Sequence, residues 1–150
     1  MLHQTETQWM GKMQFNALVN GHTIIMDAPV KSGGEDLGST PKPFLLTAMA
    51  GCTGMDIVVL LKKQNIQLES LNLKVSGETG KQTPVVYVAA NIVYEITGHT
   101  KDKQAAIDAV LYSQEKMCGV SHMLKKIMPV TWQIIYNGEQ VYNNREETKS

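Results

Sequence analysis

The sequence predicts an α+β domain built on antiparallel sheets. β-type runs occur in neighbouring pairs, and Asn20-Gly21, a dipeptide typical of tight hairpin turns, joins the first pair. One long apolar helix, at residues 39–63, separates these first strands from the later ones. Strands and helices do not alternate regularly along the chain as they do around a parallel sheet, which favours the α+β class.

The first third of the chain is predicted to be a hairpin followed by a loop. Residues 8–17 alternate large apolar and polar side chains, which is typical of a half-buried strand. Residues 22–28 form the returning strand. Residues 29–38 are rich in glycine and polar side chains, so we expect a loop that leads to the helix.

The helix at residues 39–63 is the longest element that the sequence predicts. Thr40 is a suitable N-cap, and Pro41 suits the first helical position, where its missing N–H costs nothing. Apolar residues occur on every side of the helix, so we expect it to be buried on most sides, in a core or a subunit interface.

The second half of the chain contains two further β-type runs, two helical segments around a break at Gly119, and a final strand. We predict no second domain, so a single domain covers residues 1–150 and ends in a frayed polar tail. The predicted elements are strands at 68–77 and 85–97, helices at 102–116 and 120–126, a strand at 130–136, and the tail at 143–150.

Composition excludes several classes of protein. The 150 residues contain 14 basic and 14 acidic side chains without a basic stripe, so nucleic acid is not an expected partner. The first ten residues do not resemble a signal peptide, and we find no apolar run of the ~18 residues needed to span a bilayer. We therefore expect a cytoplasmic protein with no membrane association, in which cysteines are normally reduced.

Cys52 and Cys118 are the main candidates for chemistry. The chain has no CxxC motif, which excludes a thioredoxin-like site and a four-cysteine zinc site. Both residues could be small core hydrophobes, because free cysteine is often buried. Alternatively, Cys118 lies beside a predicted helix start, where the helix dipole lowers the pKa of a thiol. Cys52 lies among small residues that would let a substrate or another backbone approach.

Three polar residues near the cysteines are possible supporting groups. Asp56 lies one helical turn after Cys52, and a carboxylate in an apolar helix needs a partner. It either forms a hydrogen bond with a hydroxyl or backbone group, or it takes part in proton transfer near the thiol. Glu115, one turn before Cys118, is either a similar group or a solvated helix position. His122, four residues after Cys118, is either a surface histidine or an imidazolium that supports a thiolate.

Lys42 is a further candidate, because a lysine in the first turn of a helix opposes the helix dipole. It is either a neutral surface exception or a cation that holds an anionic group. The other histidines show no spacing that would complete a metal site around His122, so the sequence indicates neither a metal nor an organic cofactor.

Two segments together resemble the OsmC/Ohr family of osmotically inducible and organic hydroperoxide resistance proteins. They are TPKPFLLTAMAGCTGMDIV at residues 40–58 and SQEKMCGVSHML at residues 113–124. The order of strands and helices also agrees, across nearly the whole chain. The aspartate four residues after the first cysteine is similar to the YhfA-like branch.

The resemblance implies an OsmC-like fold in which antiparallel sheets wrap around long central helices of an intertwined homodimer. It also implies a thiol peroxidase that reduces organic hydroperoxides in the oxidative stress response. Cys52 would attack the peroxide and become a sulfenic acid, and Cys118 would resolve it to a disulfide. A dithiol reductant, such as a lipoylated protein, would then restore the thiols.

The sequence departs from the family pattern at two positions. Active members pair the first cysteine with an arginine from the N-terminal strands and a glutamate at the start of the long helix. Here the N-terminal strands contain Lys12 but no arginine, and the single arginine, Arg145, lies in the tail. The family glutamate follows a proline, and in this chain Lys42 follows Pro41 in its place. A small-molecule-binding or redox-sensing protein with weak or no turnover therefore stands as the alternative, because lysine lacks the planar fork of arginine.

Overall fold

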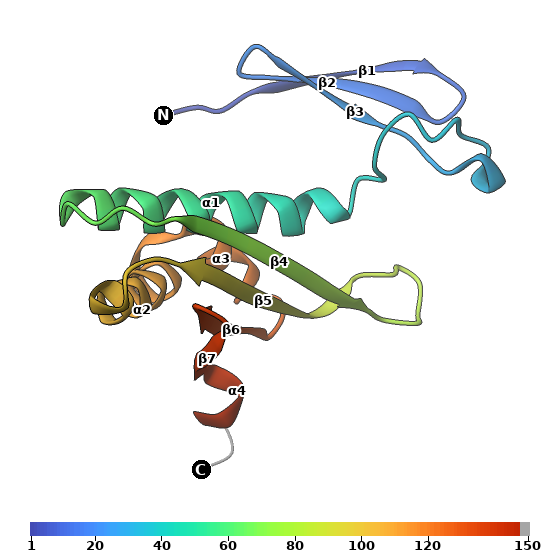
Figure 1. The fold of residues 1–150 in the computed structure, drawn as a ribbon. Coiled ribbons are helices and arrows are strands. Elements are labelled where there is room, and N and C mark those ends of the chain that lie inside the picture. Colours follow the sequence, from blue (N-terminus) through green and yellow to red (C-terminus); the bar gives the residue numbers. More distant parts are fainter. Residues whose placement is uncertain (148–150) are drawn as a thin grey trace. The chain divides into compact units, whose positions relative to one another are not determined.

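The computed structural model describes residues 1–147, with side chains as far as Arg145 (Figure 1). The chain divides into two compact units, Met1–Leu45 and Leu46–Ser150, called unit 1 and unit 2 below. The expectation of a single domain over the whole chain remains a prediction.

Unit 1 contains a three-stranded antiparallel sheet in the order β1 (Thr5–Gly11), β2 (Gln14–Val19) and β3 (His22–Met26). The predicted single strand at residues 8–17 is wrong, because the chain reverses within it. Lys12 (φ 47°) and Met13 form the turn, directly after Gly11 (φ 111°) at the end of β1.

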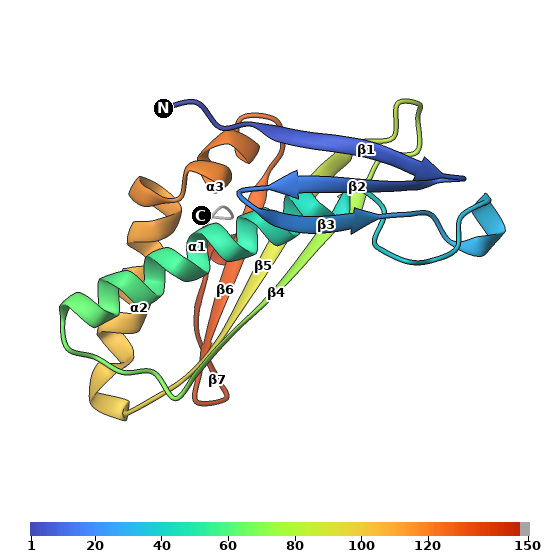
Figure 2. The ribbon, with the colours of Figure 1, turned by 90° about the horizontal axis from the view of Figure 1, so that it is seen from above.

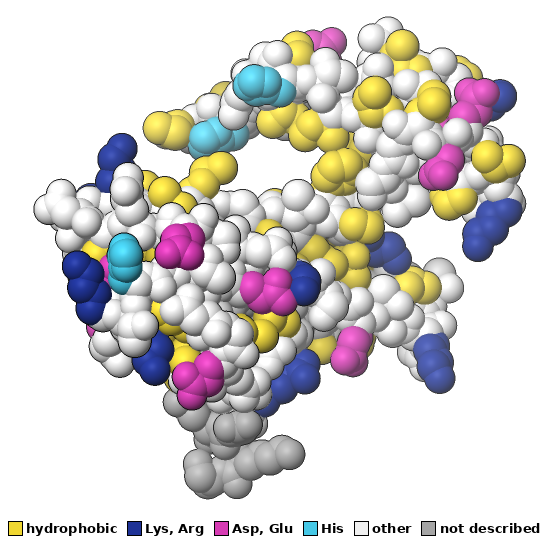
Figure 3. Space-filling view, in the orientation of Figure 1, with side chains coloured by type: hydrophobic (Ala, Val, Ile, Leu, Met, Phe, Trp, Pro, Cys, Tyr) yellow, Lys and Arg dark blue, Asp and Glu magenta, His cyan; other side chains and the backbone are white. Residues whose placement is uncertain are grey.

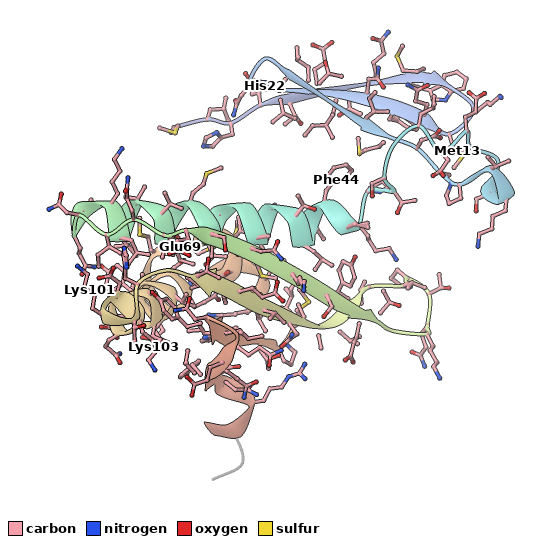
Figure 4. The ribbon with its side chains drawn as sticks, viewed as in Figure 1. Met13, His22, Phe44, Glu69, Lys101 and Lys103 are labelled. Carbon is pink, nitrogen blue, oxygen red and sulfur yellow. The ribbon has the colours of Figure 1, made fainter. Side chains whose placement is uncertain are left out.

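The second turn of unit 1 is confirmed. Asn20 and Gly21 have φ values of 50° and 82°, as a tight turn of this kind requires. Figure 4 shows Met13 in the first turn and His22 at the start of β3, just after the second.

The loop after β3 is organised by the buried carboxylate of Asp27. Its Oδ1 accepts a hydrogen bond from the backbone N–H of Ala28 (2.8 Å), and its Oδ2 accepts from Glu35 (3.0 Å) and Leu37 (3.2 Å). Burial alone would raise the pKa of Asp27, but these three donors, with the charge of Lys12, hold the pKa below its ordinary value.

Asp27→Asn is expected to loosen this loop, because an amide offers one acceptor oxygen where three N–H groups need partners. Folding lowers the pKa of Asp27, so the carboxylate stabilises the folded loop at pH values above the pKa that it has in the unfolded chain. This stabilisation is lost as the pH falls through the folded pKa. Acid titration followed by the amide NMR signals of Glu35 and Leu37 should show this transition in the wild type and lack it in the variant.

The long helix α1 (Pro43–Lys63) begins two residues later than the predicted Pro41 start. Ser39 forms a bridge with Met26, which holds the chain extended before the helix. Its end at Lys63 agrees with the prediction. Within the chain only one face is buried, formed by Met49, Thr53, Ile57 and Leu61. The expectation of burial on most sides, in a core or a subunit interface, remains a prediction, because the structure describes one chain.

α1 is also long and apolar enough to cross a membrane by length and composition, with a mean hydropathy of 2.0 over 18 residues. The prediction that no apolar run is long enough to span a bilayer is therefore wrong, because it considered only uninterrupted apolar stretches. The observation is weak evidence for a membrane span, because a core helix of a soluble protein passes the same test. Here Met49, Ile57 and Leu61 pack in the core of unit 2.

Unit 2 contains a four-stranded sheet in the order β4-β5-β6-β7. β5 and β6 pair in parallel, so the prediction of purely antiparallel sheet is wrong at this pair. Parallel neighbours need a long crossover, which here contains three helical segments and a short 3₁₀ turn, η2 (Thr100–Asp102). The other elements are β4 (Ser70–Thr79), β5 (Tyr87–Thr97), α2 (Lys103–Tyr112), the π-helical turn η3 (Ser113–Met117), α3 (Gly119–Leu124), β6 (Val130–Tyr136) and β7 (Glu139–Asn143).

The sequence prediction missed β7 and the short helix α4 (Asn144–Glu147), which replace most of the predicted frayed tail. The expected turn at Asn137-Gly138 is confirmed and leads into β7. Arg145 folds back, and its Nε donates to Thr131 Oγ1 at 3.1 Å. Residues 148–150 of the predicted tail lie outside the described residues.

The core of unit 2 lies between one face of this sheet and the helices (Figure 2). Alternate residues of β5 and β6 are buried on that face, including Ile92, Tyr94, Trp132 and Ile134. They pack with α1, α2 and α3 in one hydrophobic cluster. This two-layer arrangement places α1 and the segment around Cys118 on the same side of the sheet.

Candidate functional site: a dithiol beside a carboxylate

The structure brings Cys52, Asp56 and Cys118 together within unit 2. The two sulfur atoms and a carboxylate oxygen all lie within 4.8 Å of one another. Cys52 and Asp56 lie one turn apart on α1 and are half-buried, whereas Cys118 is only 2% exposed. The site therefore has one accessible sulfur and one buried sulfur.

A change in helix geometry places Cys118. The π-helical turn η3 interrupts the regular helix, and π turns occur frequently at functional sites. Cys118 then adopts an extended conformation (φ −72°, ψ 102°) and caps α3. Its Sγ accepts a hydrogen bond from the N–H of Ser121 at 3.3 Å.

Burial raises the pKa of the Cys118 thiol, and the adjacent Cys52 thiol raises it further. The hydrogen bonds from Ser121 lower the pKa, but their effect is smaller than that of burial. The prediction that a helix start would lower this pKa is therefore wrong, because desolvation outweighs the cap. Cys118 is therefore held as a thiol.

A buried network of polar side chains adjoins the sulfurs. Gln114 Nε2 donates to Tyr94 OH at 2.7 Å and to Ser121 Oγ at 3.1 Å. Burial raises the pKa of Tyr94 far above its ordinary value, so its hydroxyl remains protonated. The Oε1 atom of Gln114 is buried and has no hydrogen-bond partner among the described residues.

The same network reaches Asp56 through hydroxyl groups. Ser113 Oγ donates to Asp56 Oδ2 at 2.9 Å and lies 2.8 Å from Thr53 Oγ1, which lies 2.9 Å from Tyr94 OH. Because the carboxylate only accepts, the hydroxyl groups can all donate in one direction. Tyr94 then donates to Thr53, Thr53 donates to Ser113, and Ser113 donates to Asp56. This network connects α1, β5 and η3, and it gives Asp56 the hydroxyl partner that its sequence position required.

Lys125 is a cation near Cys118 that the sequence analysis missed. Its Nζ donates to the backbone oxygen of Gln114 at 2.6 Å and lies 4.4 Å from the ring centroid of Trp132. Burial lowers the pKa of Lys125, and a negative charge on Cys118, when it is a thiolate, opposes this shift. The lysine therefore places positive charge near Cys118.

The other predicted supporting residues are placed differently. His122 and Glu115 are exposed on α3 and η3, as expected for surface positions. Lys12 forms an ion pair with Glu35 at 2.7 Å in unit 1, and Lys42 precedes α1 in the same unit. A role for either lysine at the dithiol remains a prediction.

The sequence offered partial signals for the residues that were missed. Ser113, Gln114 and Ser121 belong to the segment SQEKMCGVSHML, and Thr53 directly follows Cys52. Each could have been selected as a polar residue beside a candidate cysteine. Tyr94 had no such signal, because a tyrosine in a β-type run is usually explained by packing alone.

Fold and site together define a two-cysteine protein of mixed α+β architecture, with two sheets and a pair of thiols, one on the long helix α1 and one at the start of α3. Residues 33–133 match the family described as OsmC-like protein, and the chain belongs to this family. The sequence is 30% identical over 129 residues to Protein YhfA of Escherichia coli (strain K12), covering 85% of this chain and 93% of that protein.

Solved structures share the fold. A hypothetical protein from Aquifex aeolicus VF5 has a TM-score of 0.75 and 24% identity, covering 91% of this chain and 98% of its own. A protein from Legionella pneumophila, titled an organic hydroperoxide resistance protein OsmC, has a TM-score of 0.65 and 16% identity, covering 89% and 96%. These similarities show that the mixed α+β OsmC-like fold is shared.

Proposed function

We propose that this protein is a thiol peroxidase that reduces organic hydroperoxides. The observation that carries the proposal is the approach of the Cys52 and Cys118 sulfurs to within 4.8 Å. The sulfurs must approach further, to the ~2.05 Å of a disulfide bond, when the bond forms. Membership of the OsmC family and the name of the Legionella relative support the choice of substrate.

The proposed reaction has three balanced steps. The Cys52 thiolate attacks one peroxide oxygen, the O–O bond breaks, and the other oxygen leaves as an alcohol after taking a proton. The resulting sulfenic acid condenses with the Cys118 thiol to form a disulfide and water. An external dithiol, for which we propose a lipoylated protein or a small dithiol, then reduces the disulfide by exchange.

The geometry supports this division of roles. Cys52 is half-buried and reachable, whereas Cys118 is buried and its pKa is raised. A buried thiol is protected from direct oxidation, so we expect Cys118 to react only after a sulfenic acid has formed on the neighbouring Cys52.

The test is consumption of cumene hydroperoxide with dihydrolipoamide as reductant. Wild type should turn over, and Cys52→Ser should lose about 10²-fold or more in rate, because the remaining cysteine, Cys118, is buried. Circular dichroism should show that the variant is folded. Equal rates for the two proteins would refute the assignment of Cys52.

We further propose that the protein is a cytoplasmic homodimer in which a second copy covers α1. An apolar groove of about 710 Å³ runs along α1 and β4, and Met55, which lines it, is 72% exposed. Hydrophobic side chains are visible at this surface in Figure 3. Such exposed apolar surface is typical of an interface. The groove is lined by Ala50, Gly51, Gly54, Met55, Val58, Val59, Leu71 and Leu73.

Val58→Asp is expected to shift the protein from dimer to monomer, because it places a charge in this groove, where partner contact would desolvate it. Light scattering coupled to gel filtration measures the mass. Ile127→Asp, at an apolar residue that is 74% exposed outside the groove, is the matched control and should leave the mass unchanged. A wild type that is monomeric at micromolar concentration would contradict the proposal.

The alternative is a redox-sensing or small-molecule-binding protein. The observation that favours it is the absence of arginine before Arg145, which removes the guanidinium expected to orient a peroxide in this family. A sensor would form the Cys52–Cys118 disulfide with one equivalent of peroxide but turn over slowly with excess dithiol. The peroxidase assay therefore separates the two functions.

A further inference from the structure

We propose that the reduced protein binds a thiophilic divalent cation, of which Zn²⁺ is the model, through Cys52 Sγ, Cys118 Sγ and a carboxylate oxygen of Asp56. The sequence indicated no metal site, because it contains no closely spaced set of ligands. The fold creates the set by placing Cys118 opposite one turn of α1. The proposal does not depend on the peroxidase reaction.

The three ligand atoms already have nearly the required spacing. Tetrahedral zinc binds sulfur at about 2.3 Å and oxygen at about 2.0–2.2 Å, so its ligand atoms lie about 3.6–3.8 Å apart. Here they lie within 4.8 Å of one another. A contraction of about 1 Å or less, within the range of side-chain rotation, would close the site.

The surrounding hydrogen bonds suit a metal site. Metal ligands are usually held by further hydrogen bonds that set their orientation. Ser113 Oγ donates to Asp56 Oδ2 and the N–H of Ser121 donates to Cys118 Sγ, at 2.9 Å and 3.3 Å. Ser113 is itself hydrogen-bonded to the buried Thr53, so buried side chains fix the orientation of the Asp56 carboxylate.

Charge and access are also compatible with a bound cation. Two thiolates and one carboxylate around Zn²⁺ carry one net negative charge, and Lys125 interacts electrostatically with the charged form of Cys118. Binding releases the two thiol protons to solvent, since the ligands must be deprotonated. Cys52 and Asp56 are half-buried, so water can occupy a fourth position, as in zinc sites with three protein ligands.

Metal binding and disulfide formation would exclude each other, because both use the same two sulfurs. The reduced protein would hold the cation, and oxidation to the disulfide would release it. Preference for a soft cation follows from the two thiolates, which select Zn²⁺ over Mg²⁺ or Ca²⁺.

The test is an anaerobic titration of the reduced, metal-stripped protein with Co²⁺, followed by competition with Zn²⁺. Wild type should develop thiolate-to-cobalt charge-transfer absorption that saturates at one cobalt per chain and disappears when Zn²⁺ is added. Cys52→Ser and Cys118→Ser should each weaken that absorption and the binding. Asp56→Asn should weaken binding about tenfold or more, and the disulfide form of the wild type should not bind.

Glu115→Gln is the matched control, because it removes an exposed carboxylate near Cys118 in sequence and should leave cobalt affinity unchanged. Circular dichroism verifies that each variant is folded, and Asp56→Glu, which keeps a carboxylate, should partly restore binding. The absence of charge-transfer absorption in wild type, or equal affinity in wild type and Asp56→Asn, would overturn the three-ligand site. A protein that binds no cobalt but consumes peroxide would overturn this proposal alone.

Discussion

Replacing Cys118 with serine is expected to leave peroxide attack at Cys52 intact and to stop the cycle before a disulfide forms. Cys118 is the only other cysteine in the chain, and its sulfur lies within 4.8 Å of Cys52. Without it, a sulfenic acid on half-buried Cys52 has no thiol to condense with. The intermediate should therefore accumulate where solvent can reach it.

Intact-mass spectrometry after one equivalent of cumene hydroperoxide measures this result. Wild type should lose two hydrogens as the disulfide forms, whereas Cys118→Ser should gain one oxygen and react with dimedone. Cys52→Ser serves as the control and should show neither change. A dimedone adduct at Cys118 in wild type would reverse the proposed order of the two cysteines.

Tyr94→Phe is expected to lower the free energy of unfolding by about 1–3 kcal/mol. Its hydroxyl lies at the centre of the buried network, 2.9 Å from Thr53 Oγ1 and 2.7 Å from Gln114 Nε2. Removing it leaves both neighbours with one partner fewer in a region without solvent. The ring remains, so the hydrophobic contacts are conserved and the loss reports the hydrogen bonds.

Urea unfolding followed by circular dichroism measures this difference. Tyr112→Phe is the matched control, because Tyr112 is 53% exposed and its loss of a hydroxyl should change stability by less than about 0.5 kcal/mol. If the two variants are equally stable, the network at Tyr94 does not contribute to folding as its geometry indicates.

The elements of the fold were predictable where neighbouring residues decide them. Asn20-Gly21 and Asn137-Gly138 form the expected turns, because both residues of each pair adopt positive φ values that glycine and asparagine tolerate. The strand at residues 8–17 was wrong, because the turn at Lys12 and Met13 lacks that dipeptide. The start of α1 was wrong because the bridge between Ser39 and Met26, distant in sequence, keeps the chain extended.

The candidate site was predictable in part. Asp56 was selected because a carboxylate in an apolar helix needs a partner, and the structure provides Ser113. Lys125 and Tyr94 were not selected, since their positions relative to Cys118 arise from packing across the core. The effect of burial on the pKa of Cys118 was also missed, because helix position is local information and desolvation is not.

The sequence by itself determined the family, most of the strands and helices, and the cysteines with Asp56 as candidates, since periodicity and motifs depend on residues that are close along the chain. Only the tertiary structure decided the parallel pairing of β5 with β6, the burial of Cys118, and the meeting of two sulfurs with a carboxylate. The physical reason is that these features depend on which surfaces pack together and exclude water. The packing brings together residues from distant parts of the chain.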